Sequence, residues 1–391
     1  MHAALLRGSP FIAFAPADAA RAAPLISPIN QRRIRIFKAN RRAVWSLWLF
    51  VVLYGLTIAA EFIANDRPIL ASYKGELLVP ALVDYPETKF GGFLAQTIYR
   101  DPFIADEISA NGWMVWPPIR YADATVDESL GTSAPAPPWW MVPQDVRCSR
   151  YPLGMDDPAC HDWGNLHWLG TDDQGRDVLT RLIYGFRISV TFGLLLTVAS
   201  SIIGVIVGAV QGYFGGWTDL IGQRLLDVWG SMPTLYVLLI VSSVLVPGFW
   251  VLLAVLILMS WTSLVGIVRA EFLRARNLEY VAAARALGLS NGQIMRRHLL
   301  PNAMVATLTF MPFIAGGSVS TLTSLDFLGL GLPPGSPSLG ELLNQGKEYI
   351  FAPWLSLTSF SVIALILLLF VFIGEGVRDA FDPRKTFAGR A

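Results

Sequence analysis

Residues 279–302 read EYVAAARALGLSNGQIMRRHLLPN, and this stretch decides how the chain is organised between two of its long apolar segments. Its first nine residues are mostly alanine, leucine and arginine, which favour a helix. Gly288 follows at the position after a helix end where a positive φ is favoured. Ser290 and Gln293 have the spacing of a capping box for a second helix. Pro301 then starts another helix, where its missing N–H costs nothing. The stretch therefore predicts two short helices arranged in an L.

Long apolar blocks surround this stretch. The chain has 391 residues, of which 53% are hydrophobic and 15% charged, with a mean hydropathy of +0.49. Soluble domains carry about 25% charged residues, whereas a block of ~20 apolar residues spans a bilayer as a helix. The sequence therefore predicts an all-α integral membrane protein with six transmembrane helices and a long segment after the first. The predicted spans are residues 43–64, 188–210, 220–246, 249–268, 302–330 and 354–374. An amphipathic helix, capped by Thr171 or Asp172, is expected at 173–186.

The distribution of charge orients these spans. Residues 31–42 hold six basic and no acidic residues, and residues 269–301 hold six arginines against two glutamates. Residues 65–167 hold seven basic and fourteen acidic residues. Basic loops stay on the cytoplasmic side of a membrane. We therefore expect both termini in the cytoplasm and the acidic segment outside it.

These patterns divide the chain into five parts. They are a cytoplasmic segment 1–42, a first transmembrane helix 43–64, a periplasmic segment 65–170, a core 171–375 with five spans and the loop 270–301, and a cytoplasmic tail 376–391. Because the chain contains no phosphate-binding loop, it is not expected to bind ATP itself.

The loop resembles a known motif. AAARALG and RHLLPN are similar to the EAA loop of ABC importer permeases, with Ala283, Ala284, Gly288, Leu300 and Pro301 at matching spacing. Two positions depart from the motif, since Ala282 replaces its glutamate and His298 its isoleucine. The resemblance implies a helix that inserts into a groove on an ATPase. The residues expected to couple the two proteins are Glu279, Ala282, Ala283, Ala284, Arg285, Gly288, Leu300 and Pro301.

Other segments extend the resemblance to the dipeptide/oligopeptide permease family. They include LGTDDQGRDVLTRLIYGFRIS at 169–189 and GEGVRDAFDPRK at 374–385. NRRAVWSLWLFVVLYGL at 40–56 and NGWMVWPPIRY at 111–121 are most similar to Yej-type permeases, E subunit, whose cargo includes microcin-type antibiotics. The match is weakest at 1–26 and 135–161.

The resemblance implies a set of partners. They are a second homologous permease forming a heterodimer, separate or fused ABC ATPase subunits that bind ATP and Mg, a periplasmic peptide-binding protein and membrane lipid, with no nucleic acid. The location implied is the bacterial inner membrane. The chain itself would be a non-catalytic half of a peptide pathway, with no cofactor of its own.

Several residues outside the loop are candidates for other roles. Cys148 and Cys160, on the oxidising side, are expected to form a disulfide, the alternative being two free thiols. Arg224 and Asp227 are expected to pair with each other or with the second permease. Asp326 either lines the pathway or orders the turn SLDFLGLG.

Two further groups of residues have expected structural roles. Asp172, Asp173 and Asp177 fit a capped helix start better than a cation site, and no metal site or catalytic constellation is expected. The four tryptophans Trp113, Trp116, Trp139 and Trp140 are expected in the core of the outer segment.

Two rival functions are weaker. A proton-coupled secondary transporter would show inverted repeats and broken helices, and no repeat is evident. A membrane-anchored enzyme with its site in residues 65–167 lacks any catalytic pattern there.

Overall fold

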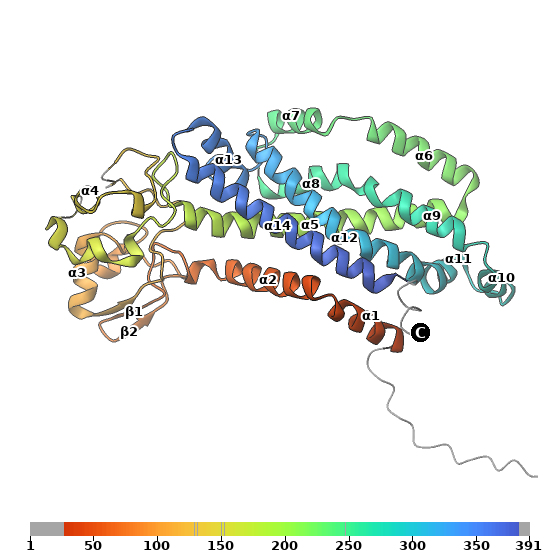
Figure 1. Cartoon of the computed structure of the whole chain (residues 1–391), viewed down its shortest axis with the longest axis horizontal. Coiled ribbons are helices and arrows are strands. Elements are labelled where there is room, and N and C mark those ends of the chain that lie inside the picture. Colours follow the sequence, from red (N-terminus) through yellow and green to blue (C-terminus); the bar gives the residue numbers. More distant parts are fainter. Residues whose placement is uncertain are drawn as a thin grey trace, which may run out of the picture.

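The structure is a computed structural model that describes residues 27–382 apart from 129, 131, 150, 152 and 247, and its long helices form one elongated bundle (Figure 1). A small mixed domain lies at one end of the bundle, which we call the sheet end. The short helix α10 (Glu279–Ala286) lies at the opposite end, which we call the hairpin end (Figure 1). Of the predicted terminal segments 1–42 and 376–391, residues 1–26 and 383–391 lie outside the described residues.

The bundle is built from helices of very different length. They are α1 (Pro28–Ala39), α2 (Arg41–Ile58), α5 (Val178–Phe214), α6 (Gly216–Gly230), α7 (Thr234–Val244), α8 (Phe249–Ser260), α9 (Val265–Ala275), α11 (Asn291–Ile294), α12 (Leu300–Phe327), α13 (Leu339–Glu348) and α14 (Pro353–Phe381).

Among the described residues, five helical stretches are long and apolar enough to cross a membrane, and a bent pair makes a sixth if it is one span. The pair is α6 and α7, which meet at 69°. The sequence predicts one span over 220–246, but Pro233 caps the start of α7 and breaks the helix there, since proline removes a backbone donor. The mostly helical membrane architecture is otherwise confirmed.

Helix α5 differs from its predicted form. Instead of a surface helix at 173–186 followed by a span, one 37-residue helix runs from Val178 to Phe214. Its cap is Asp177, whose carboxylate accepts the Thr180 N–H at 2.8 Å, and not Thr171 or Asp172. No glycine or proline interrupts the chain between the two predicted pieces, and Arg187 at their junction is paired with Glu61 at 2.7 Å.

A stripe of small residues brings α5 against α9. Gly204, Gly208 and Gly212 recur every four residues on one face of α5. A Cβ added at Gly208 would lie 2.7 Å from the carbonyl oxygen of Val265, so only glycine permits this approach. Small residues at this spacing let membrane helices pack backbone to backbone.

The sheet end holds a feature that the sequence did not predict. A three-stranded antiparallel sheet has the order β2 (Glu76–Leu78), β1 (Leu70–Tyr73) and β3 (Gly112–Val115). The helix α3 (Pro102–Asn111) packs on this sheet. The helix α4 (Gln144–Cys148), which comes later in the sequence, lies at the same end of the molecule (Figure 1). The core is formed by Ala71, Tyr73, Leu78, Phe90, Tyr99, Ile104 and Ile108.

The predicted tryptophan core is largely wrong. Trp113 is 49% exposed and Trp140 is 56% exposed, and of the four only Trp116 packs against the core of the sheet. Trp139 instead contacts Trp168, with ring centroids 5.7 Å apart. The strands carry their buried residues as tyrosine, alanine and leucine, so the rarer tryptophans were a misleading signal.

Candidate functional site: the hairpin end

The turn between α10 and α11 has the predicted backbone. Gly288 has a φ of +80°, a conformation that favours glycine, and its N–H donates to the carbonyl of Arg285 at 2.9 Å. Ser290 Oγ accepts the Gln293 N–H at 3.4 Å, and Gln293 Oε1 accepts the Ser290 N–H at 3.1 Å. The predicted L of two helices and its capping box are therefore present.

The second arm of the L differs from the prediction. Helix α11 has only four residues and passes through a π-helix at residues 295–299 directly into α12, without a break. Pro301 lies in the first turn of α12 and has no N–H to donate to a carbonyl of the preceding turn. That preceding turn is the wider π-helix at residues 295–299. Single π turns inside helices are frequent at functional sites.

One face of the hairpin is anchored to the bundle. Val281, Ala284, Ile294 and Leu299 are buried in a cluster with Phe272 of α9 and neighbouring residues of α5 and α12. Ala284 is 5% exposed, so its predicted place on the docking surface is corrected, because a three-residue step from Val281 puts both on the inner side of the helix. Leu300 is half-buried against the same cluster.

The other face of the hairpin is exposed. Among the predicted coupling residues it carries Glu279, Ala282, Ala283, Arg285, Gly288 and Pro301. Leu287, which the motif spacing did not single out, is 80% exposed at the tip. Leu278 and Tyr280 are 46% and 39% exposed beside it. We call Leu278, Tyr280, Ala282, Ala283, Ala286 and Leu287 the hairpin face.

Polar contacts hold the hairpin end to α5. Tyr213 donates its hydroxyl to Asn291 Oδ1 at 2.7 Å, and the guanidinium of Arg285 lies 5.5 Å from the centre of the Tyr213 ring. Close by, Arg269 of α9 forms a bidentate pair with Asp219 of α6 at 2.5 and 2.7 Å. The hairpin end is therefore held to α5, and α9 beside it is held to α6.

At the sheet end, the first turn of α5 is fixed by a buried histidine. His167 Nδ1 lies 2.9 Å from Asp177 and Nε2 lies 3.1 Å from Asp127, with the ring stacked on Tyr121 at 4.3 Å. Burial lowers the pKa of His167, but the hydrogen bonds to Asp127 and Asp177 outweigh it and leave that pKa above its ordinary value. We call His167 with these two aspartates the histidine clamp.

The remaining candidates fall into separate places. Arg224 and Asp227 lie 3.1 Å apart and are 76% and 63% exposed, so they pair with each other in this chain. Asp326 is buried, accepts the Leu332 N–H at 2.8 Å and also bonds Ser338, so it orders the turn after α12.

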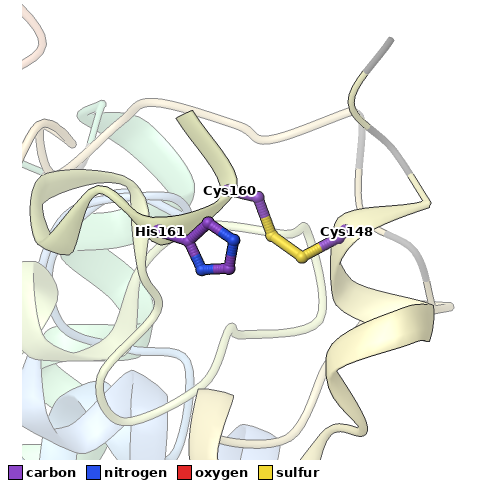
Figure 2. A group of neighbouring side chains, drawn as sticks. All are labelled: Cys148, Cys160 and His161. Atoms are coloured by element: carbon purple, nitrogen blue, oxygen red, sulfur yellow. A yellow bond between two sulfur atoms is a disulfide. The ribbon is translucent and has the colours of Figure 1, made fainter. Parts of the chain in front are cut away.

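Cys148 and Cys160 form a disulfide, with the ring of His161 beside it (Figure 2). These three are the one group of at least three potential metal-binding side chains within 4.8 Å among the described residues. Both sulfurs are used by the bond, so they offer no thiolate to a metal.

Comparison with known proteins identifies the family to which the chain belongs. Residues 181–387 match the family described as binding-protein-dependent transport system inner membrane component, and residues 27–80 match the N-terminal TM domain of oligopeptide transport permease C. The chain belongs to this family of transport permeases. The hairpin end lies within the first matched region.

Relatives within the family are close. The chain is 65% identical to the peptidoglycan transport system permease protein YejE of Agrobacterium fabrum, over 93% of this chain and 95% of the relative. It is 52% identical to the inner membrane ABC transporter permease protein YejE of Escherichia coli, over 92% and 98%. The expected resemblance to Yej-type ABC permeases is therefore confirmed.

A solved structure is more distant. The methionine ABC transporter MetNI in an inward-facing conformation matches with 18% identity and a TM-score of 0.45, over 52% of this chain and 97% of that chain.

The permease of Bacillus subtilis named for oligopeptide transport, OppC, is 34% identical over 59% of this chain and 75% of the relative.

Proposed function

We propose that this chain is the transmembrane subunit of an ATP-driven peptide importer, forms half of its translocation pathway and couples to an ATPase through residues 279–302. The observation that carries the proposal is the hairpin: an apolar exposed face on a short helix whose inner side is locked to α5, α9 and α12. Exposed apolar patches on otherwise well-packed proteins mark interaction sites.

The contact with the ATPase is steric and not ionic at position 282. Ala282 and Ala283 are exposed and small, so a partner's backbone can approach closely there. Glu279 and Arg285 stand at the two ends of α10 and leave the centre of its outer side uncharged. A groove lined by apolar side chains fits this face.

The chain is proposed to carry no catalytic site of its own. ATP and Mg would bind to the partner ATPase, whether separate or fused, and a second homologous permease would complete the pathway. The basic hairpin end would face the cytoplasm with both termini, and the acidic sheet end would face the periplasm, where a peptide-binding protein delivers cargo. The exposed pair Arg224 and Asp227 is available to the second permease.

The cargo is proposed to be peptides. Relatives are named for oligopeptide transport and, in the case of the 65% identical one, for peptidoglycan transport. Peptide fragments of peptidoglycan are therefore a second candidate cargo. Microcin-type cargo stays a prediction.

One experiment tests the coupling. The chain is purified with its partners, and ATP hydrolysis is measured with and without peptide-loaded binding protein. The double change Ala283→Leu and Gly288→Leu should abolish the stimulated part of hydrolysis. Ala283→Leu alone, which leaves the φ of the turn unchanged, should lower it by obstructing the groove. A chain that never copurifies with an ATPase, or that supports uptake driven by a proton gradient without ATP, would refute the proposal.

A further inference from the structure

A groove of about 580 Å³ lies where α1, the first turns of α2 and the end of α14 meet, toward the hairpin end of the bundle (Figure 1). This volume is within the range of ligand-binding pockets, about 300–1,000 Å³. All three helices contribute apolar side chains to its lining, among them Phe37, Leu47 and Val377. Two basic side chains, Arg33 and Lys38, line it as well, and no acidic side chain does.

Asn40 and Gly376 explain how the groove forms. Asn40 ends α1 and caps α2, because its carboxamide accepts the Ala43 N–H at 3.3 Å, so two separate helices meet at this residue. Helix α1 packs on α14. A Cβ added at Gly376 would collide with the Cβ of Ala43 and lie 2.9 Å from the Phe37 ring, so the glycine permits this close approach. The contact closes the inner side of the groove and leaves its outer side open, where Trp48 is 62% exposed.

The two ends of the groove lie at different depths in the membrane. Helix α2 is one of the helices long and apolar enough to cross the bilayer, so Leu47 and Trp48 lie beside the acyl chains, and a tryptophan near the start of a span is typical of the interface. Arg33 and Lys38 precede the span and lie at the level of the headgroups. A groove that is basic at one end and apolar at the other matches the two-part chemistry of a lipid.

The basic side chains of the groove are available to an anion. Arg33 donates one hydrogen bond, to Asn30 Oδ1 at 3.2 Å, and its guanidinium lies 4.4 Å from the centre of the Phe381 ring. A guanidinium has five N–H donors, so most of them remain for a ligand. Lys38 makes no ion pair within the part of the chain that the structure describes. Arginine binds phosphate through two parallel hydrogen bonds, and lysine binds it through its charge.

Charge also selects the class of lipid. Residues 31–42 hold six basic and no acidic residues, and basic clusters beside a span attract anionic lipids. The acidic side chains near the end of α14, Asp379 and Asp382, do not line the groove. The ammonium of a zwitterionic headgroup would therefore lie near Arg33 and Lys38 with no carboxylate to bind, which disfavours such a lipid.

We propose that this groove binds one anionic phospholipid from the leaflet at the hairpin end. Its phosphate lies between Arg33 and Lys38, and an acyl chain follows Leu47 and Val377 into the bilayer. The inference goes beyond the proposed function, because it assigns a site and a lipid class, whereas any membrane span contacts lipid. The bound lipid joins α1 to α14 beside the start of α2.

Photo-labelling of the purified complete transporter in nanodiscs tests the site. The probe is phosphatidylglycerol with a photoreactive diazirine in one acyl chain, diluted into unlabelled phosphatidylcholine. The comparison probe is phosphatidylethanolamine with the same chains. Adducts are mapped by peptide mass spectrometry, and apparent affinity is read from the probe fraction at half-maximal labelling. We expect the wild type to be labelled at residues 44–48 and 374–381, at a severalfold lower fraction of phosphatidylglycerol than of phosphatidylethanolamine.

Lys38→Gln should weaken the apparent affinity for phosphatidylglycerol about fivefold, and the double change Arg33→Gln and Lys38→Gln roughly 30-fold. Arg35→Gln is the matched control, because Arg35 is an exposed basic residue of α1 that does not line the groove. It should change the affinity by less than about twofold, since salt screens an exposed charge outside the site. Leu47→Trp keeps every charge but fills the groove, so it should remove labelling of residues 374–381, and it serves if the charge variants do not assemble.

Equal labelling by the two probes, or unchanged labelling in Lys38→Gln and Leu47→Trp, overturns this site. An equal loss in Arg35→Gln would show a general attraction to the basic segment and overturn it too. No adduct in the groove at any probe fraction would show that another part of the protein covers it, with the same consequence. Displacement of the probe by inorganic phosphate would show an anion site without lipid and also overturn it. ATP hydrolysis is not read in this experiment, so each of these results leaves the proposed function standing.

Discussion

Replacing Leu287 by glutamine should separate the ATPase from the permease without unfolding the permease. Leu287 lies at the tip of the hairpin face and is 80% exposed in this chain. Exposed substitutions of this kind usually change stability by less than about 0.5 kcal/mol. Any larger effect must therefore come from a partner.

The expected size follows from the exposed area. Fully burying a leucine side chain contributes about 1.5–3 kcal/mol. Leu287 has 80% of its surface left to bury, so docking it completely would contribute about 1.2–2.4 kcal/mol on the same scale. That corresponds to a loss of roughly 8- to 60-fold in ATPase affinity.

The assay is a titration of purified ATPase onto the solubilised permease pair, read by fluorescence anisotropy. Stimulated ATP hydrolysis is followed in parallel. Leu82→Gln is the matched control, since Leu82 is 65% exposed at the sheet end. An ATPase affinity for the Leu287 variant within twofold of wild type would contradict docking through the hairpin face.

Three further predictions concern other parts of the chain. The histidine clamp has a raised folded pKa, so its stabilisation is fully present below the ordinary value of 6.5 and is lost as pH rises through the folded value. Amide hydrogen exchange around residues 165–171 should therefore speed up at high pH beyond its intrinsic rate, and His167→Gln should remove that dependence. Changing Cys148 and Cys160 together to serine should release the loop between them, which the disulfide closes across 12 residues. The loss should destabilise this region by about 3 kcal/mol, and limited proteolysis should then cut the loop faster. A variant as resistant to the protease as the wild type would argue against the disulfide. Asp219→Asn should remove the ion pair with Arg269 and lower the free energy of unfolding by about 1 kcal/mol, a value discounted for the partial exposure of the pair. A thermal-shift assay should show a lower melting temperature, and stimulated ATP hydrolysis should fall.

Local signals predicted the hairpin well. A glycine after a helix end and a serine–glutamine box each act within a few residues, so the sequence contains their cause. The predicted helix start at Pro301 was wrong, because a π turn joins α11 to α12 without a break. The long apolar helices were predictable for the same reason, because the bilayer requires ~20 apolar residues in one run.

Features that depend on contacts between residues far apart in the sequence could not be predicted. The three strands are three or four residues long. β2 pairs with β1 through the adjacent turn at Lys74 and Gly75, but β3 pairs with β1 only because the chain returns to it after about forty residues. The histidine clamp likewise joins His167 to Asp127 across 40 residues. Ala284 lies three residues after Val281 and so shares its face, but which face of α10 turns inward depends on the cluster that both form with Phe272 of α9.

Helix α5 has one further consequence. Its 37 residues extend about 55 Å at 1.5 Å per residue, whereas the hydrocarbon core of a bilayer is about 30 Å thick. One end is fixed by the histidine clamp and the other contacts the hairpin through Tyr213. About 25 Å of the helix therefore exceeds the hydrocarbon thickness. A rigid tilt of about 10° about its midpoint would move its two ends by about 5 Å in opposite directions, together with the histidine clamp and the hairpin that they contact. Such a tilt would displace the hairpin end whenever the sheet end is displaced, without any change in the conformation of α5 itself.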